Sequence, residues 1–308
     1  MSDQSNEIGA FKTLAEVNKS RSMGDIDRAI DLLLQASKAL EQLTSDERFR
    51  LWSLYYYESA NVNQILGNYH LSVAENRRSS GIALEGGDPI RGWVGSFTAN
   101  LASYVGDLIS AEQYLEKLRA AAGEFDRLGE PNVSDIGIFN SFRFSLRLAT
   151  ANVLFDLNDQ QFLPEAEEVF VDEHFQSRIV RNVTAFKLID LQLRARIHMM
   201  SGNLDKAIDT FKIYVDFPSR DLPNDQRFID YAKKWPIEFA RDFRDCGQAL
   251  TGLGGHQHAM RAVDVWRAGL DRSFGQEGPS YDWANRRYRR EIEELLIKFE
   301  PRLDQFEL

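Results

Sequence analysis

The sequence predicts an all-α chain, and three observations carry this prediction. Apolar residues recur every three or four positions over long segments, which is the period of a helix with one buried side. Alternating runs typical of strands are nearly absent, and only 8 of the 308 residues are proline. A short phrase also recurs, as "SANVNQILGN" from Ser59, "TANLASYVGD" from Thr98 and "TANVLFDLND" from Thr150. Recurrence at a few tens of residues indicates stacked structural units.

Breaks that contain glycine divide the chain into helical hairpins. The segments "MGDIDRAI" from Met23, "LGNYHLSV" from Leu66, "VGDLISAE" from Val105 and "SGNLDKAI" from Ser201 each place Gly before Asp or Asn and then an apolar residue. Glycine can adopt the left-handed conformation that ends one helix, and Asp or Asn can cap the next. The same reasoning predicts six hairpins, with turns near Gly24, Gly67, Gly106, Asn158, Gly202 and Gly254.

Two of these turns carry a resemblance to a known family. The segments "GDIDRAIDLLLQA" from Gly24 and "GNLDKAIDTF" from Gly202 resemble the turn and second helix of tetratricopeptide (TPR) repeats. In the sixth unit, Cys246 with Gly247 and then Ala259 stand at family positions, whereas His256 stands where an aromatic is usual. The turns are 39 to 52 residues apart, more than the roughly 34 residues of the family, so the chain resembles irregular bacterial arrays.

The resemblance implies a right-handed superhelix, an α-solenoid, of about six TPR-like hairpins over residues 8–271. A further helix from Trp283 to Glu300, within residues 280–304 of the same domain, has apolar residues on one side and would cap the last hydrophobic face. At its start, "NRRYRR" from Asn285 is expected to pair with the following "EIEE" at helical spacing, although it could also grip an acidic partner or phosphate. The polar segments 216–226 and 272–282 are predicted loops.

Composition excludes several classes of function. Acidic residues outnumber basic ones by 47 to 37, a net charge of -10, which disfavours binding to nucleic acid. The single cysteine, Cys246, can form no intrachain disulfide and is expected to be a buried small residue. No segment has the charge pattern of a signal peptide or the roughly 18 apolar residues of a membrane span. We therefore expect a cytoplasmic protein without membrane insertion.

A column of polar residues runs along the first helices of the six hairpins. Its members are Asn18, Asn61, Asn100, Asn152, Arg196 and Gln248. In the TPR family this column faces the concave groove, where an Asn can hydrogen-bond the backbone of an extended peptide. The resemblance therefore implies a polar ladder along such a groove. The alternative is that these side chains bridge neighbouring repeats or meet solvent.

Neighbouring columns add further candidates for a groove that binds a partner. They are Tyr57, Trp93, Tyr104, Phe155, Gln192, Arg241 and Arg244. If these residues share the concave wall, it is aromatic in its early and middle parts and basic at its far end. Such a surface suits a peptide or protein with apolar anchors and an acidic end. The alternative for each aromatic is packing between repeats. Leu14 and Ser96 stand where the family's two-carboxylate clamp needs basic residues, so that clamp is not predicted.

No motif points to catalysis. The pair His256 and His258 has no third ligand at metal-site spacing, and no Gly-rich phosphate loop or nucleophile triad can be assembled. We therefore predict a non-enzymatic scaffold or adaptor that binds a peptide or partner protein in its concave groove and needs no cofactor or metal. The alternative is a regulatory sensor that binds a signalling peptide or small molecule and relays a change in superhelix shape.

Overall fold

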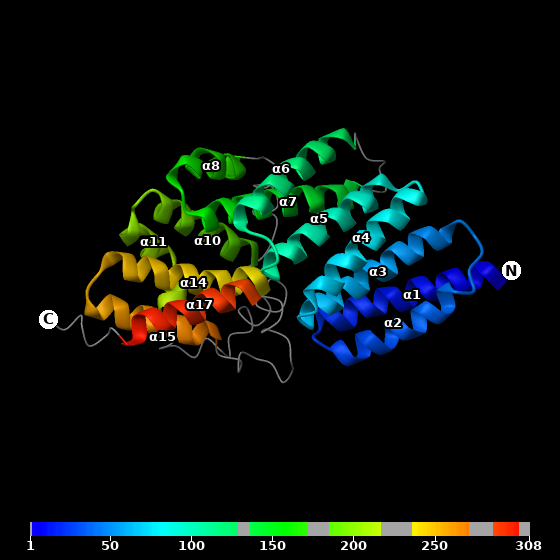
Figure 1. Ribbon diagram of the computed structural model, residues 1–308, viewed down its shortest axis with the longest axis horizontal. Helices are drawn as coiled ribbons and strands as arrows, with labels where there is room; N and C mark the ends of the chain where they lie inside the picture. The colour runs from blue at the N-terminus through cyan, green and yellow to red at the C-terminus, as the bar shows by residue number, and fades with distance from the viewer. Residues whose placement is uncertain (1, 129–135, 172–184, 217–235, 271–285, 302–308) are drawn as a thin grey trace. The chain divides into compact units, whose positions relative to one another are not determined.

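The computed structural model describes residues 2–128, 136–171, 185–216, 236–270 and 286–301 (Figure 1). Within these ranges all regular structure is helical, with fourteen α-helices, one 3₁₀ helix and no strand. The prediction of an all-α chain is therefore confirmed. None of the helices in these ranges is long and apolar enough to cross a membrane. The described residues up to Phe142 form one compact unit, unit 1, and those from Arg143 form a second, unit 2.

Unit 1 consists of helices that pair along the chain. They are α1 (Ser2–Ser22), α2 (Ile26–Leu40), α3 (Glu47–Ile65), α4 (Tyr69–Glu85), α5 (Pro89–Val105), α6 (Ala111–Arg127) and the first part of α7 (Ile136–Leu157). Helices α1 and α2, α3 and α4, and α5 and α6 pack against each other, as three predicted hairpins require. Helix α4 also packs against α5, and α3 packs against both α1 and α2, so successive hairpins are in contact.

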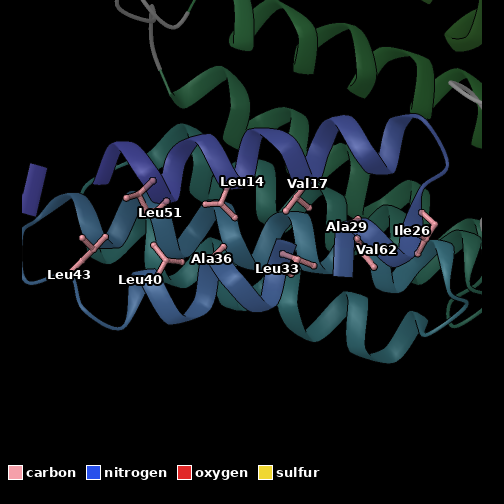
Figure 2. Packing of buried hydrophobic residues seen from close by; sticks show 11 residues of the cluster. Leu14, Val17, Ile26, Ala29, Leu33, Ala36, Leu40, Leu43, Leu51 and Val62 are labelled. Carbon is pink, nitrogen blue, oxygen red and sulfur yellow. The ribbon is translucent and has the colours of Figure 1, made fainter. Parts of the chain in front are cut away.

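A cluster of aliphatic side chains joins the first three helices (Figure 2). Leu14 and Val17 of α1 lie between α1 and α2, where Leu33 faces them, and α3 contributes Leu51. Burying one such side chain contributes about 1.5–3 kcal/mol. Ala29 of α2 has no exposed surface, and its small size lets the two helices of the hairpin approach closely.

All six predicted turns lie between helices. Four of them place a glycine in the left-handed region, with φ between 73° and 81° at Gly24, Gly67, Gly202 and Gly254. In the fourth turn Asn158 adopts φ 48°, a conformation that Asn tolerates better than most residues. At these five positions the local sequence determines where one helix ends.

The third turn differs from the prediction. Gly106 has φ -79°, and Asp107 adopts the left-handed conformation instead, with φ 61°. Glycine is required at position 106 for packing, because a Cβ there would lie 2.5 Å from the ring of Tyr69. The next helix, α6, begins after Ser110, which forms a capping box with Gln113.

Capping by the predicted Asp or Asn occurs in only one of the four Gly-Asp or Gly-Asn turns. The Asp25 side chain accepts a hydrogen bond from the backbone N–H of Arg28 at 3.2 Å. Asn68 and Asn203 precede α4 and α11 but make no capping hydrogen bond through their side chains. Asp107 cannot cap α6, since Ser110 takes that position. The pattern thus predicted the places of all four turns and three of the four N-cap residues, of which only Asp25 caps through its side chain.

Unit 2 is organised around α14 (Pro236–Leu253), a helix that packs against five others. The elements of the unit are α7 from Arg143, η1 (Gln160–Phe162), α8 (Leu163–Val171), α10 (Ala185–Met200), α11 (Leu204–Thr210), α12 (Lys212–Val215), α14, α15 (His256–Leu270) and α17 (Arg286–Phe299). Helix α14 packs against α10, α11, α12, α15 and α17. Nine consecutive residues, 239–247, are buried, so the charged side chains of this segment are buried with the apolar ones.

Gly247 and Trp266 form a close contact between α14 and α15. A Cβ on Gly247 would lie 2.1 Å from Nε1 of Trp266. The indole N–H donates to the backbone carbonyl of Arg244 at 3.1 Å, and Trp266 has no exposed surface. The absence of a side chain at position 247 therefore lets the indole lie directly on the backbone of α14.

Helix α17 is the predicted helix near the carboxyl end, and it covers α14 and α15. Ile292 is fully buried, and the Phe299 ring lies 5.4 Å from that of Trp266. On its other side, Arg289 pairs with Glu293 at 2.9 Å and Arg290 with Glu294 at 2.8 Å. The expected pairing of the arginine run with "EIEE" is therefore confirmed. Residues 217–226 and 272–282 of the two predicted loops lie outside the described residues.

Candidate functional site

Unit 2 contains a pocket of about 390 Å³ between four of its helices. The apolar part of its wall consists of Phe155, Met199, Met200 and Leu295, and two amides, Asn158 and Gln248, also line it. The charged part consists of the cations Arg196, Arg244 and Lys298 and the anions Asp156, Asp245, Glu291 and Glu294. Pockets that hold small molecules usually have volumes of about 300–1,000 Å³, so this one has a suitable size.

Helical spacing places these side chains on the pocket wall. Residues three, four and seven apart share one side of a helix, and the lining residues of α10, α14 and α17 follow this rule. Met199 and Met200 lie three and four residues after Arg196, and Gln248 lies four after Arg244. Glu291, Glu294, Leu295 and Lys298 repeat the spacing on α17, and Phe155 and Asp156 come from the last turn of α7.

Buried ion pairs form the back of the pocket. The Arg196 guanidinium donates from Nη2 to Asp242 at 2.6 Å and from Nε to Asp245 at 2.5 Å. Arg244 donates to Asp156 at 2.6 Å, to Asp245 at 2.7 Å and to Glu291 at 2.5 Å. The side chains of both arginines are at most 7% exposed. Charges at this depth are tolerated only when each is paired and hydrogen-bonded.

Two tyrosines complete the network. The Tyr288 hydroxyl donates to Asp156 at 2.7 Å and accepts a hydrogen bond from Arg241. The guanidinium groups of Arg241 and Arg244 both lie over its ring, 4.6 and 4.7 Å from the centroid, which adds cation–π attraction. The Tyr214 hydroxyl donates to Asp242 at 3.0 Å and accepts from the Gln192 amide at 2.6 Å. These contacts connect α7, α10, α12, α14 and α17 through polar groups alone.

Asp242 holds its proton more tightly than an ordinary aspartate. Burial raises its pKa from 3.8 to about 8, against the opposing effects of Arg196 and of the hydrogen bond from Tyr214. Between these two pH values the folded chain holds a proton that the unfolded chain has released. The contribution of Asp242 to stability is therefore full below about pH 4 and is lost as the pH rises toward 8.

Substitution of Asp242 by Asn is expected to flatten this pH dependence. The amide matches the protonated carboxyl in shape, so the free energy of unfolding of Asp242→Asn should fall less between about pH 4 and about pH 8 than that of the unaltered chain, by a few kcal/mol at most. Urea unfolding across this range measures the difference. Asp205→Asn, at an exposed position of α11, is the matched control and should keep the original slope. Parallel curves for Asp242→Asn and the unaltered chain would show that Asp242 is ionised in the folded chain throughout.

Four of the residues predicted to line the groove lie together on the pocket wall. They are Phe155, Arg196, Arg244 and Gln248. Only Gln248 of these is exposed. Gln192 and Arg241 are buried behind the wall, where they bind Tyr214 and Tyr288. Asn152 is 3% exposed, and its Oδ1 has no hydrogen-bond partner among the described residues.

The remaining polar candidates lie in unit 1. Asn18 is exposed, and its Oδ1 accepts from Arg21 and from Ser22, both at 3.2 Å. Asn61 and Asn100 are half-buried. The Nδ2 atom of Asn61 is buried, and within the described part of the chain it has no hydrogen-bond partner. None of these three residues lines the pocket of unit 2.

The aromatic candidates of unit 1 are mostly packing residues. Trp93 is 5% exposed, donates to the Ala121 carbonyl at 2.8 Å and stacks on Phe97. Tyr104 is 1% exposed and stacks on Tyr114 with 4.4 Å between ring centroids. Tyr57 is half-buried, and burial together with the nearby Glu58 raises its pKa. Packing, the alternative reading of these aromatics, accounts for the contacts of Trp93 and Tyr104.

Sequence reasoning missed the acidic half of the site. Asp156, Asp242 and Asp245 are not among the predicted residues, and Glu291 was expected only to pair with the arginine run before it. A signal was present, because Arg-Asp occurs twice, three residues apart, on a helix whose other residues from Phe239 to Gly247 are apolar or small. Two Arg-Asp dipeptides within an otherwise apolar helical segment indicate that the arginines and aspartates pair with opposite charges inside the protein.

The single cysteine, Cys246, directly follows Asp245 of the pocket wall on α14. Cys246 is fully buried, and burial raises the pKa of its thiol. No group of three or more His, Cys, Asp or Glu side chains that could hold a metal ion occurs in the described residues. Comparisons of the whole chain with protein-family models, curated proteins and solved structures found no match.

Proposed function

We propose that the chain is a non-enzymatic interaction protein, a scaffold or adaptor built as a right-handed superhelix of about six TPR-like hairpins with a capping helix. In this proposal it binds a peptide or a partner protein along the side formed by the first helices of its hairpins. The supporting observation is the pocket in unit 2. Helices α7, α10 and α14 are the first helices of the fourth, fifth and sixth predicted hairpins, and all three contribute to its wall.

The wall favours a partner with an apolar anchor. Phe155, Met199 and Leu295 supply apolar surface, and methionine adapts to side chains of different shape. Arg241 and Arg244 are buried against carboxylates or a tyrosine hydroxyl. An acidic end of the partner would therefore have to meet Arg196 or Lys298 instead.

The volume of the pocket also supports a second candidate function. A space of about 390 Å³ with polar and apolar walls is typical of small-molecule sites. In this alternative the chain is a sensor whose ligand connects α7, α10, α14 and α17, and a partner protein would detect the resulting change in shape.

Photo-crosslinking from position 248 tests the first proposal. A photoreactive amino acid in place of Gln248, which is exposed and lines the pocket, should capture a partner from native lysate. Gln257 of α15 is also exposed but does not line the pocket. The same substitution at position 257 is therefore the matched control. The expected result is one prominent adduct, identified by mass spectrometry, that forms from position 248 and not from position 257.

A synthetic copy of the captured segment should then bind the unaltered chain and lose most of its affinity for Gln248→Trp, in which the indole occupies the pocket mouth. The Gln257→Trp variant should bind as the unaltered chain does. Equal capture from both positions, or equal affinity of both variants, would remove the pocket from the partner site.

A further inference from the structure

Two groups of opposite charge on the pocket wall, one buried and one partly exposed, have hydrogen-bonding capacity left over. Arg196 is 2% exposed, and its hydrogen bonds use Nε and Nη2, so that Nη1 has no partner among the described residues. The side chain of Glu291 is 24% exposed, and its Oε2 accepts from Arg244. Its Oε1 lies 3.9 Å from Arg287, beyond hydrogen-bond distance, and accepts no hydrogen bond within the described ranges.

These two groups come from different helices, Arg196 from α10 and Glu291 from α17, and both line the pocket. The other charged groups at the back are committed to internal pairs. Asp245 accepts from both Arg196 and Arg244, and Asp156 accepts from Arg244 and Tyr288. Besides the exposed polar groups of the wall, a ligand in the pocket therefore meets a donor on the buried Arg196 and an acceptor on the partly exposed Glu291 that no other described side chain uses.

The wall carries charges of both signs, and this disfavours a ligand that is only an anion or only a cation. A simple anion would lie close to Glu291 and Glu294, and a simple cation would lie close to Arg196 and Lys298. A ligand that carries both charges satisfies both groups, because a carboxylate accepts from a guanidinium and an ammonium donates to a carboxylate. The rest of the wall includes Phe155, Met199, Met200 and Leu295, which offer apolar surface.

The volume of the pocket limits the size of the ligand. Its 390 Å³ equals the volume of about a dozen water molecules in the liquid, which suits a molecule of that many non-hydrogen atoms. We propose that the pocket binds a free zwitterionic amino acid or dipeptide with apolar side chains, whose carboxylate accepts from Arg196 and whose ammonium donates to Glu291. This inference names a ligand class for the sensor alternative. It shares with the proposed function only the location of the site.

Isothermal titration calorimetry on the purified full chain tests this inference with named probes. L-leucine represents the free amino acids, and L-leucyl-L-leucine represents the dipeptides. The compound with the lower dissociation constant shows which of the two classes the pocket fits better. N-acetyl-L-leucine lacks the ammonium and L-leucinamide lacks the carboxylate. Each blocked compound should bind at least about tenfold more weakly than L-leucine, because N-acetyl-L-leucine leaves Glu291 without its ligand partner and L-leucinamide leaves Arg196 without its ligand partner.

Substitutions on α17 provide a second test of the proposed contact between the ligand and Glu291. Glu291→Gln removes the negative pole and should weaken binding of the zwitterion at least about tenfold, while Glu293→Gln, whose parent side chain is exposed and pairs with Arg289 outside the pocket, should leave it unchanged. If Glu291→Gln does not fold, as judged by circular dichroism, the comparison of blocked and free probes on the unaltered chain decides alone.

The inference is overturned if neither L-leucine nor the dipeptide binds, if the blocked probes bind as tightly as the free ones, or if a folded Glu291→Gln behaves like Glu293→Gln. Failure here is distinguishable from failure of the proposed function. A partner captured specifically from position 248 by a chain that binds none of the probes would overturn the small-ligand site and leave the interaction protein in place.

Discussion

Substitution of Arg244 by Met is expected to lower the free energy of unfolding by about 3–5 kcal/mol. The substitution keeps an aliphatic stem but removes the cation that three carboxylates share, those of Asp156, Asp245 and Glu291. The Asp156 and Asp245 side chains are only 5% exposed, so each would lose one of its charged partners in a medium that stabilises charge poorly. Asp245 would keep Arg196, and Asp156 would keep Tyr288 and the 3.4 Å contact to Arg241. Urea unfolding followed by circular dichroism measures the effect.

Arg267→Met is the matched control for this prediction. Arg267 pairs with Glu300 at 2.8 Å, but its side chain is 61% exposed. A pair this accessible to water contributes less than about 1 kcal/mol, so the control should unfold close to the unaltered chain. Similar losses of unfolding free energy for the two variants would mean that water reaches the ion pairs behind the pocket and screens them as it does a surface pair.

Substitution of Gly247 by Ala is expected to cost about 1–3 kcal/mol, or more if Trp266 has to leave its site. The added Cβ would overlap the indole Nε1, which a rigid ring cannot avoid by changing one torsion. Displacement of the ring also breaks its hydrogen bond to the Arg244 carbonyl. The midpoint of urea unfolding reports the loss, and a change in tryptophan fluorescence of the folded state shows whether the ring has moved.

Gly123→Ala separates this steric effect from the general effect of adding a methyl group to a helix. Gly123 lies inside α6, and an added Cβ would meet no atom within 4 Å. Alanine favours a helix over glycine by up to about 1 kcal/mol, so this variant should be as stable as the unaltered chain or more so. If Gly247→Ala is also neutral or stabilising, the contact between α14 and Trp266 is not tight.

The positions of the helix ends could be predicted from the sequence because they depend on local physics. Gly24, Gly202 and Gly254 adopt a left-handed conformation that few other residues tolerate, and this preference can be read without knowing the fold. The third turn shows the limit of that reasoning. Gly106 is required by the ring of Tyr69, a residue 37 positions earlier, and only the packed structure contains that information.

Burial of charge could not be predicted in the same way. Arg241 and Arg244 were expected at the basic end of the groove, facing a partner, and their burial depends on helices α10, α12 and α17 covering α14 on several sides. Whether Arg196 meets a ligand or Asp242 and Asp245 is decided by residues more than forty positions away. A column of like residues at helical spacing identifies a shared side of several helices, but it does not say what covers that side.

The single cysteine makes the interior of unit 2 accessible to a kinetic measurement on the unaltered chain. Cys246 lies in the buried segment of α14 and has no exposed surface. A thiol reagent can therefore react only with molecules in which neighbouring helices have separated from α14, at a rate set by how often that opening occurs. Because no second thiol competes, the labelling rate gives the free energy of opening around one helix, and any molecule that holds those helices together would slow it.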